Sequence, residues 1–106
     1  MTWDDILTRL EASGLHPVEE TYMENYGKIL SAQRPEFRER NFRCTYGMVK
    51  CDGIDLEFFL LPDELQRSEF MDVIATDPWW LASNNVVLHF PECDLDTVAR
   101  IMASMA

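Results

Sequence analysis

The N-terminal segment carries apolar residues at the spacing of one helix face. These residues recur at intervals of three and four positions, the period of an amphipathic helix: Trp3, Ile6, Leu7 and Leu10. Thr2 is a natural N-cap, and Asp5 three residues later suits the first turn. These features predict a helix over residues 2–13.

Two segments with the alternating pattern of strands flank Asp52-Gly53 in the centre of the chain. Asp-Gly is a strong hairpin signal because a type I′ turn needs positive φ at both central residues. Such a loop pairs Cys51 with Ile54, Lys50 with Asp55, Val49 with Leu56 and Tyr46 with Phe59. One face of the hairpin is then apolar throughout, and the other becomes apolar only away from the turn. Residues from about 41 to 61 are therefore predicted to form a hairpin.

Residues 15–33 have two interpretations. Tyr22, Tyr26 and Ile29 fall on a helical stripe. Gly27 within that stripe would cost a helix about 1 kcal/mol relative to alanine, and it could instead turn a hairpin. The helix is the preferred interpretation.

The C-terminal half alternates helical and strand patterns. The predicted elements are a helix over 62–75, a short helical turn from Asp77-Pro78 to Asn84, a strand over about 85–90 and a helix over 94–105. With the hairpin they predict an α+β fold, in which a small mixed or antiparallel sheet of three to four strands has helices packed mainly on one face. Neither a linker nor a repeat interrupts the 106 residues, so 1–106 is predicted to be a single globular domain.

Charge and composition narrow the classes of partner. The formal net charge is −10, although residues 28–50 hold six of the nine basic residues. So acidic a surface disfavours nucleic acid and favours a partner with a basic surface. No apolar run approaches the roughly 20 residues of a membrane helix, and the three cysteines lack the even number and spacing of a disulfide framework. A cytoplasmic protein that does not bind membranes is predicted.

One basic segment, Arg34–Arg43, interleaves arginine with phenylalanine. Its Arg38, Arg40 and Arg43 could bind RNA, a phosphorylated ligand or an acidic protein surface. The favoured alternative is a set of ion pairs with carboxylates of the same chain, which are of modest strength at a surface.

Residues that could carry chemistry are poorly spaced. Cys44, Cys51, His89 and Cys93 have the ligand types of a structural zinc site, but six residues separate the first two and the hairpin places them on opposite faces. Cys93 precedes a predicted helix, yet no motif of a thiol enzyme surrounds it. No catalytic residue, cofactor or metal is predicted, and an enzyme or zinc protein around His89 and Cys93 is the weakest alternative.

The adjacent Trp79 and Trp80 are the strongest candidates for a binding surface. Neighbours on a helical turn point about 100° apart, so one is expected in the core and the other partly exposed. Exposed aromatics are enriched at the centres of protein interfaces. The predicted partner-binding residues are Trp79, Trp80, Asp72, Asp77 and Glu69.

The leading hypothesis is a non-enzymatic acidic protein that binds another protein, in an inhibitor, immunity-type or adaptor role. A homodimer is compatible with this hypothesis. The alternative is a small ligand- or nucleic-acid-binding module that uses Arg34–Arg43.

Overall fold

A five-stranded antiparallel sheet forms the centre of the computed structural model, which describes residues 1–38, 43–74, 79–90 and 95–105. The elements in chain order are α1 (Trp3–Ala12), β1 (Pro17–Met23), α2 (Tyr26–Gln33), α3 (Pro35–Arg38), β2 (Thr45–Cys51), β3 (Ile54–Leu60), α4 (Glu64–Ile74), β4 (Trp80–Ser83), β5 (Val86–His89) and α5 (Leu95–Met105). The strand order is β1-β2-β3-β5-β4, which makes β1 and β4 the edge strands. The predicted α+β class is confirmed, with five strands in place of three to four.

The elements with the strongest local signals form where they were predicted. In α1, the backbone N–H of Asp5 donates to the Thr2 hydroxyl at 3.2 Å and its carboxylate accepts from the Thr2 N–H at 2.9 Å, a capping box. The predicted hairpin register is confirmed in full, from Cys51–Ile54 to Tyr46–Phe59. Asp52 and Gly53 have φ of 48° and 84°, as a type I′ turn requires.

The single helix preferred for residues 15–33 is wrong, because the segment divides into β1 and α2. β1 pairs with β2 from Pro17↔Cys51 to Met23↔Tyr46, with a bulge between Glu19 and Thr21. The extra residue at a bulge breaks the alternation of polar and apolar positions, and the strand therefore lacks its usual sequence pattern. Gly27 begins no hairpin but is buried in the first turn of α2.

The helical turn predicted before the last strand is also wrong where the structure describes it. Trp80–Ser83 form β4, which pairs with β5 through a two-residue turn at Asn84-Asn85. Asn84 has φ of 53°, a left-handed conformation that asparagine tolerates. The first residues of the predicted turn, Asp77 and Pro78, lie outside the described residues.

Alternate residues of the strands enter two hydrophobic clusters on opposite faces of the sheet. On the first face, α1 and α5 cover a cluster whose sheet residues include Val49, Leu56, Phe58, Val86 and Leu88. On the second face, α2, α3 and α4 contribute Leu30, Phe37 and Phe70 to a cluster with Tyr46, Phe59 and Val87. Helices thus cover both faces, not mainly one as predicted, since the second face is also apolar away from the turn.

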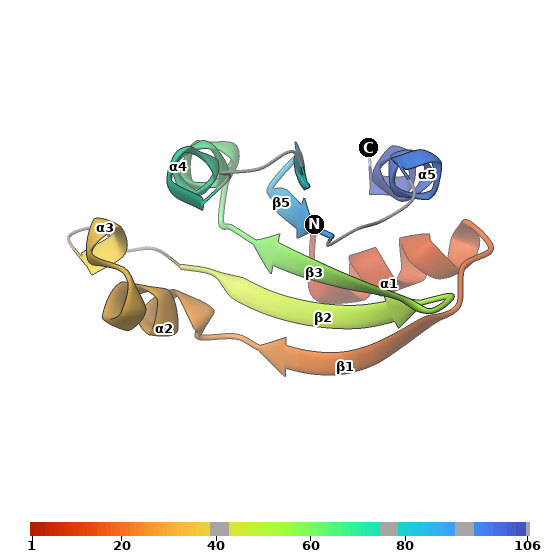
Figure 1. Ribbon diagram of the computed structural model, residues 1–106, viewed down its shortest axis with the longest axis horizontal. Helices are drawn as coiled ribbons and strands as arrows, with labels where there is room; N and C mark the ends of the chain where they lie inside the picture. Colours follow the sequence, from red (N-terminus) through yellow and green to blue (C-terminus); the bar gives the residue numbers. More distant parts are fainter. Residues whose placement is uncertain (39–42, 75–78, 91–94, 106) are drawn as a thin grey trace.

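The helices of the two faces gather at different ends of the molecule. Figure 1 shows α2, α3 and α4 at one end of the long axis, and α1 and α5 toward the other end, where the β2–β3 turn lies. The part of the second face nearest the β2–β3 turn carries the exposed residues Lys50 and Asp55. Helix cover on the second face is therefore partial.

Candidate functional site

A row of five half-buried residues crosses the second face at the limit of the helix cover. Each strand contributes one member, and each member pairs with the next through the backbone register: Thr21 (β1), Met48 (β2), Glu57 (β3), His89 (β5) and Trp80 (β4). We call these residues the cross-sheet row. The row separates the buried second-face cluster from the solvated end of the sheet.

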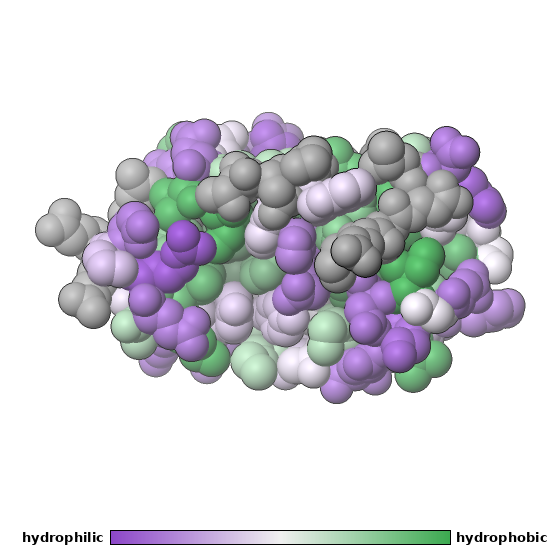
Figure 2. All heavy atoms as spheres, in the orientation of Figure 1, coloured by the Kyte–Doolittle hydropathy of each residue, from purple (hydrophilic) through white to green (hydrophobic). Residues whose placement is uncertain are grey.

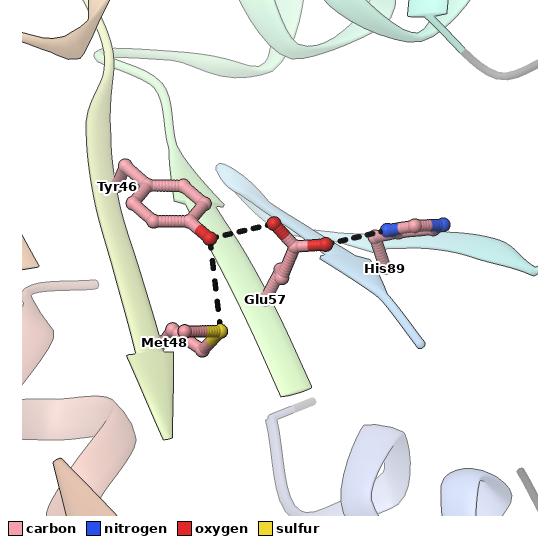
Figure 3. A network of polar contacts seen from close by, with 4 residues as sticks. All are labelled: Tyr46, Met48, Glu57 and His89. Carbon is pink, nitrogen blue, oxygen red and sulfur yellow. Dashed lines mark hydrogen bonds and ion pairs between the residues drawn. The ribbon is translucent and has the colours of Figure 1, made fainter. Parts of the chain in front are cut away.

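Two polar members of the row, Glu57 and His89, are held by short hydrogen bonds (Figure 3). The Glu57 carboxylate accepts a hydrogen bond from the Tyr46 hydroxyl at 2.6 Å, and its second oxygen lies 2.9 Å from Nδ1 of His89. A carboxylate only accepts, so Nδ1 of His89 carries a proton and Nε2 is the atom left for another partner. Burial and the neighbouring Glu57 carboxylate raise the pKa of Tyr46 well above its ordinary value, so the phenol stays a hydrogen-bond donor at neutral pH.

Trp80 closes the row at the β4 edge by stacking on His89. The two ring centroids are 4.1 Å apart and the ring planes differ by 17°. Trp80 also contacts Phe59 and Phe70, so the second-face cluster supports the stacked pair. Half-buried aromatic rings fixed on strands are rigid, which lowers the entropy lost when a partner binds.

Exposed apolar side chains continue this surface onto β1. Val18 is 63% exposed and Met23 is 40% exposed, and both pair with residues whose side chains lie on the second face, Lys50 and Tyr46. Figure 2 shows pale and light-green atoms along the middle of the lower border, where Figure 1 places β1. On the first face, by contrast, α1 and α5 cover the apolar residues of β2, β3 and β5.

The described thiols are poor nucleophiles. Burial raises the pKa of the Cys44 thiol to about 12, and burial with the nearby Asp52 raises that of Cys51 to about 11. Both are therefore protonated at neutral pH, whereas a reactive cysteine needs a lowered pKa. Cys44 belongs to the second-face cluster and Cys51 to the first, so the sheet separates them.

The structure does not assemble the weak zinc candidates as a set. His89 lies on the second face with Glu57 as its partner, and Cys93 lies outside the described residues. Among the residues that the structure describes, no group of three potential metal ligands comes together.

The two tryptophans occupy opposite faces of the sheet, and both are half-buried. Trp79 packs against the first-face cluster, with its ring 5.8 Å from that of Phe90, while Trp80 packs against the second. The prediction of one buried and one exposed ring assumed a helical turn. On a strand, successive side chains point to opposite faces, and here each face has its own cluster.

The predicted acidic surround does not form a ring about the tryptophans. Asp72 is exposed on α4 two residues after the buried Phe70, so it points away from the sheet. Glu69 is half-buried on the same helix, and Asp77 lies outside the described residues.

Of the anion-binding candidates, only Arg43 has a described side chain, and it is exposed. Arg40 and the side chain of Arg38 lie outside the described part of the chain. Arg34, at the start of the same segment, lies 3.9 Å from Glu36, a weak exposed ion pair of the kind favoured for this stretch.

Sequence reasoning missed most of the cross-sheet row. The hairpin register already placed Met48 opposite Glu57, and that pair was the available signal. Thr21 and His89 enter the row through pairings between distant segments, β1 with β2 and β3 with β5. Trp80 enters it through the β4–β5 hairpin, whose Asn84-Asn85 turn was interpreted as the end of a helical turn.

Comparisons with protein families, curated proteins and solved structures find no match to this chain. Within the described residues, no helix is long and apolar enough to cross a membrane.

Proposed function

We propose that this protein acts without catalysis by binding another protein through the second face of its sheet. The observation that carries the proposal is the unequal cover of the two faces. The second face leaves Val18 and Met23 exposed on β1, next to the half-buried Met48 of β2, and carries the half-buried Trp80 at its opposite edge. Apolar groups exposed together on one face are typical of interaction surfaces, and methionine adapts its shape to a partner.

The polar part of the row would give such an interface its specificity. Glu57 holds the His89 ring against Trp80, which presents an oriented nitrogen beside a flat aromatic surface. A partner can therefore gain contact area from Trp80 and a directed hydrogen bond from Nε2 of His89. Interface centres combine aromatic anchors with a few placed polar groups in this way.

Charge complementarity indicates a partner with a basic surface. The chain has a net charge of −10, and Glu19, Glu20 and Glu24 are all exposed on or next to β1. Complementary charge at the rim of an interface mainly raises the association rate and excludes acidic competitors. The roles that suit a small acidic binding protein are those of an inhibitor, an immunity-type protein or an adaptor.

Affinity capture from the native host with matched variants tests the proposal. The double variant Val18→Ser, Met23→Ser removes apolar groups from the second face, and Leu65→Ser removes a side chain of similar exposure, 69%, from α4. We expect the parent and Leu65→Ser to retain the same partner. The double variant should lose it, and binding of the purified partner should weaken at least about tenfold.

Circular dichroism of each variant checks that the fold is unchanged. Equal capture by all three proteins would overturn the proposed surface. If the retained protein is a second copy of the chain, sedimentation of the parent becomes concentration-dependent and that of the double variant does not.

A further inference from the structure

A hollow lies beside β1, on the first face of the sheet. It has a volume of about 360 Å³ and is lined by Thr2, Trp3, Asp4, Glu19 and Tyr22. A second hollow of about 310 Å³ shares Thr2, Trp3 and Tyr22 with it and extends toward Arg43 and Asn85. The first of these hollows, beside β1, combines two aromatic rings with two carboxylates.

The aromatic wall is rigid. The rings of Trp3 and Tyr22 stack with their centroids 5.8 Å apart and their planes 25° apart. Trp3 is only 7% exposed because its ring lies directly on Gly47 of β2, where a side chain is absent. Tyr22 is 42% exposed, so its ring is open to a ligand from solvent.

Two carboxylates at the aromatic pair accept hydrogen bonds from its rings, Glu19 in the lining of the hollow and Glu24 next to Tyr22. Nε1 of Trp3 donates to Glu19 at 3.2 Å, and the Tyr22 hydroxyl donates to Glu24 at 3.3 Å. Among the described residues, neither Asp4, Glu19 nor Glu24 forms an ion pair. Burial and the charges of Glu24, Asp4 and Glu19 raise the pKa of Tyr22.

Asp4 also lies in the first turn of α1, where a negative charge is favourable at any helix. That explanation does not extend to Glu19, which belongs to β1 and is held by the indole of Trp3. A carboxylate fixed at the edge of a stacked aromatic pair is an arrangement that suits a flat cation.

We propose that this hollow receives an arginine side chain of the partner protein. The inference rests on the proposed function and names the chemistry of the partner's contact. A guanidinium group can stack on an exposed aromatic ring while its N–H groups donate to a carboxylate. Glu19 and Tyr22 point to the first face of β1, and Val18 and Met23 to the second, so a partner that covers the β1 edge reaches both.

Binding of a short peptide tests the proposal without the partner. The probe is a blocked Gly-Arg-Gly peptide, and its control carries citrulline, which keeps the shape of arginine but has no charge. We expect a saturable shift of the Trp3 indole N–H resonance, assigned with single Trp→Phe variants, on addition of the arginine peptide only. Affinity should fall about tenfold in Glu19→Gln, and added salt should weaken binding.

Glu11→Gln is the matched protein control, because Glu11 is exposed on α1 and does not line the hollow. It removes the same charge and should bind the arginine peptide like the parent, apart from a small effect of net charge. Equal shifts with the citrulline peptide, equal losses in Glu11→Gln and Glu19→Gln, or no shift at all would each overturn the arginine site.

The experiments distinguish failure of the proposed interface from failure of the proposed arginine site. If the peptide does not bind but the Val18→Ser, Met23→Ser variant loses the partner, the second face is an interface and the hollow takes no part. If the peptide binds as expected but partner capture is unchanged in every variant, the hollow accepts a guanidinium while the proposed interface is wrong.

Discussion

Gly47 and Trp3 illustrate how a single missing side chain can position a functional residue. A Cβ atom built on Gly47 would overlap the ring of Trp3, which lies flat on β2 at this point. Trp3 in turn contacts Phe58 in the first-face cluster and Tyr22 at the hollow. The glycine is therefore needed for space.

Gly47→Ala should destabilise the fold by about 1–3 kcal/mol, since the ring must move out of a well-packed site. Urea unfolding monitored by circular dichroism measures the loss. The Trp3 indole resonance should also shift, because the hydrogen bond from Nε1 to Glu19 depends on the ring position.

The double variant Gly47→Ala, Trp3→Ala separates this cause from backbone effects. Once the ring is removed, the added methyl group has room, so Gly47→Ala should cost little in the Trp3→Ala background. An equal cost in both backgrounds would contradict the steric explanation.

At the scale of the element, the β2–β3 hairpin depends on two residues with positive φ. Gly53→Val should lower the free energy of unfolding by about 2 kcal/mol or more, because a β-branched residue resists the left-handed conformation. Gly53→Asn is the control, since asparagine accepts this conformation and should cost much less. Similar melting temperatures for the valine variant and the parent would show that the turn tolerates another conformation.

The β4 strand leads to a different expectation for the tryptophans than a helical turn does. Each ring is half-buried against its own cluster, so Trp79→Ala and Trp80→Ala should each cost about 2–4 kcal/mol. Iodide quenching of each single-tryptophan variant should show intermediate access for both rings. Complete protection of one ring from iodide and free access to the other would support the predicted helical turn and contradict the assignment of Trp80 to a strand.

At the scale of the whole molecule, burial of the two described thiols, Cys44 and Cys51, makes stability depend on pH in the alkaline range. The pKa of Cys44 rises from an ordinary 9.0 to about 12 on folding. Above pH 9 the thiol ionises in the unfolded chain but stays protonated in the folded one, so the unfolded chain is favoured as pH rises toward 12. Below pH 9 both states are protonated and this group contributes no pH dependence.

The parent should therefore lose stability between about pH 9 and about pH 11, by up to roughly 1.4 kcal/mol per pH unit from this thiol. Urea unfolding across this range provides the measurement. Cys44→Ala should show a shallower decline, because Cys51 and the tyrosines still contribute while Cys44 no longer does. Identical slopes would mean that Cys44 is not protected in the folded state.

The sequence by itself determined the parts of this protein whose causes are local. The capping box of α1 joins residues three apart, and the Asp52-Gly53 turn sets the hairpin register from the turn outward. The strand β5 and the helices α4 and α5 are likewise visible in the spacing of their own apolar residues. Local propensity and tertiary packing agree in these elements, so the pattern was sufficient.

Tertiary structure alone decided β1 and the candidate sites. β1 is a strand because the distant β2 offers it a partner across a bulge. Glu57 and His89 meet across 32 positions of the chain, and Trp3 and Glu19 across 16. Contacts of this kind depend on the order of the strands and on which face of the sheet each residue occupies. No short stretch of sequence contains that information, because the pairing energy arises only once distant segments are brought together.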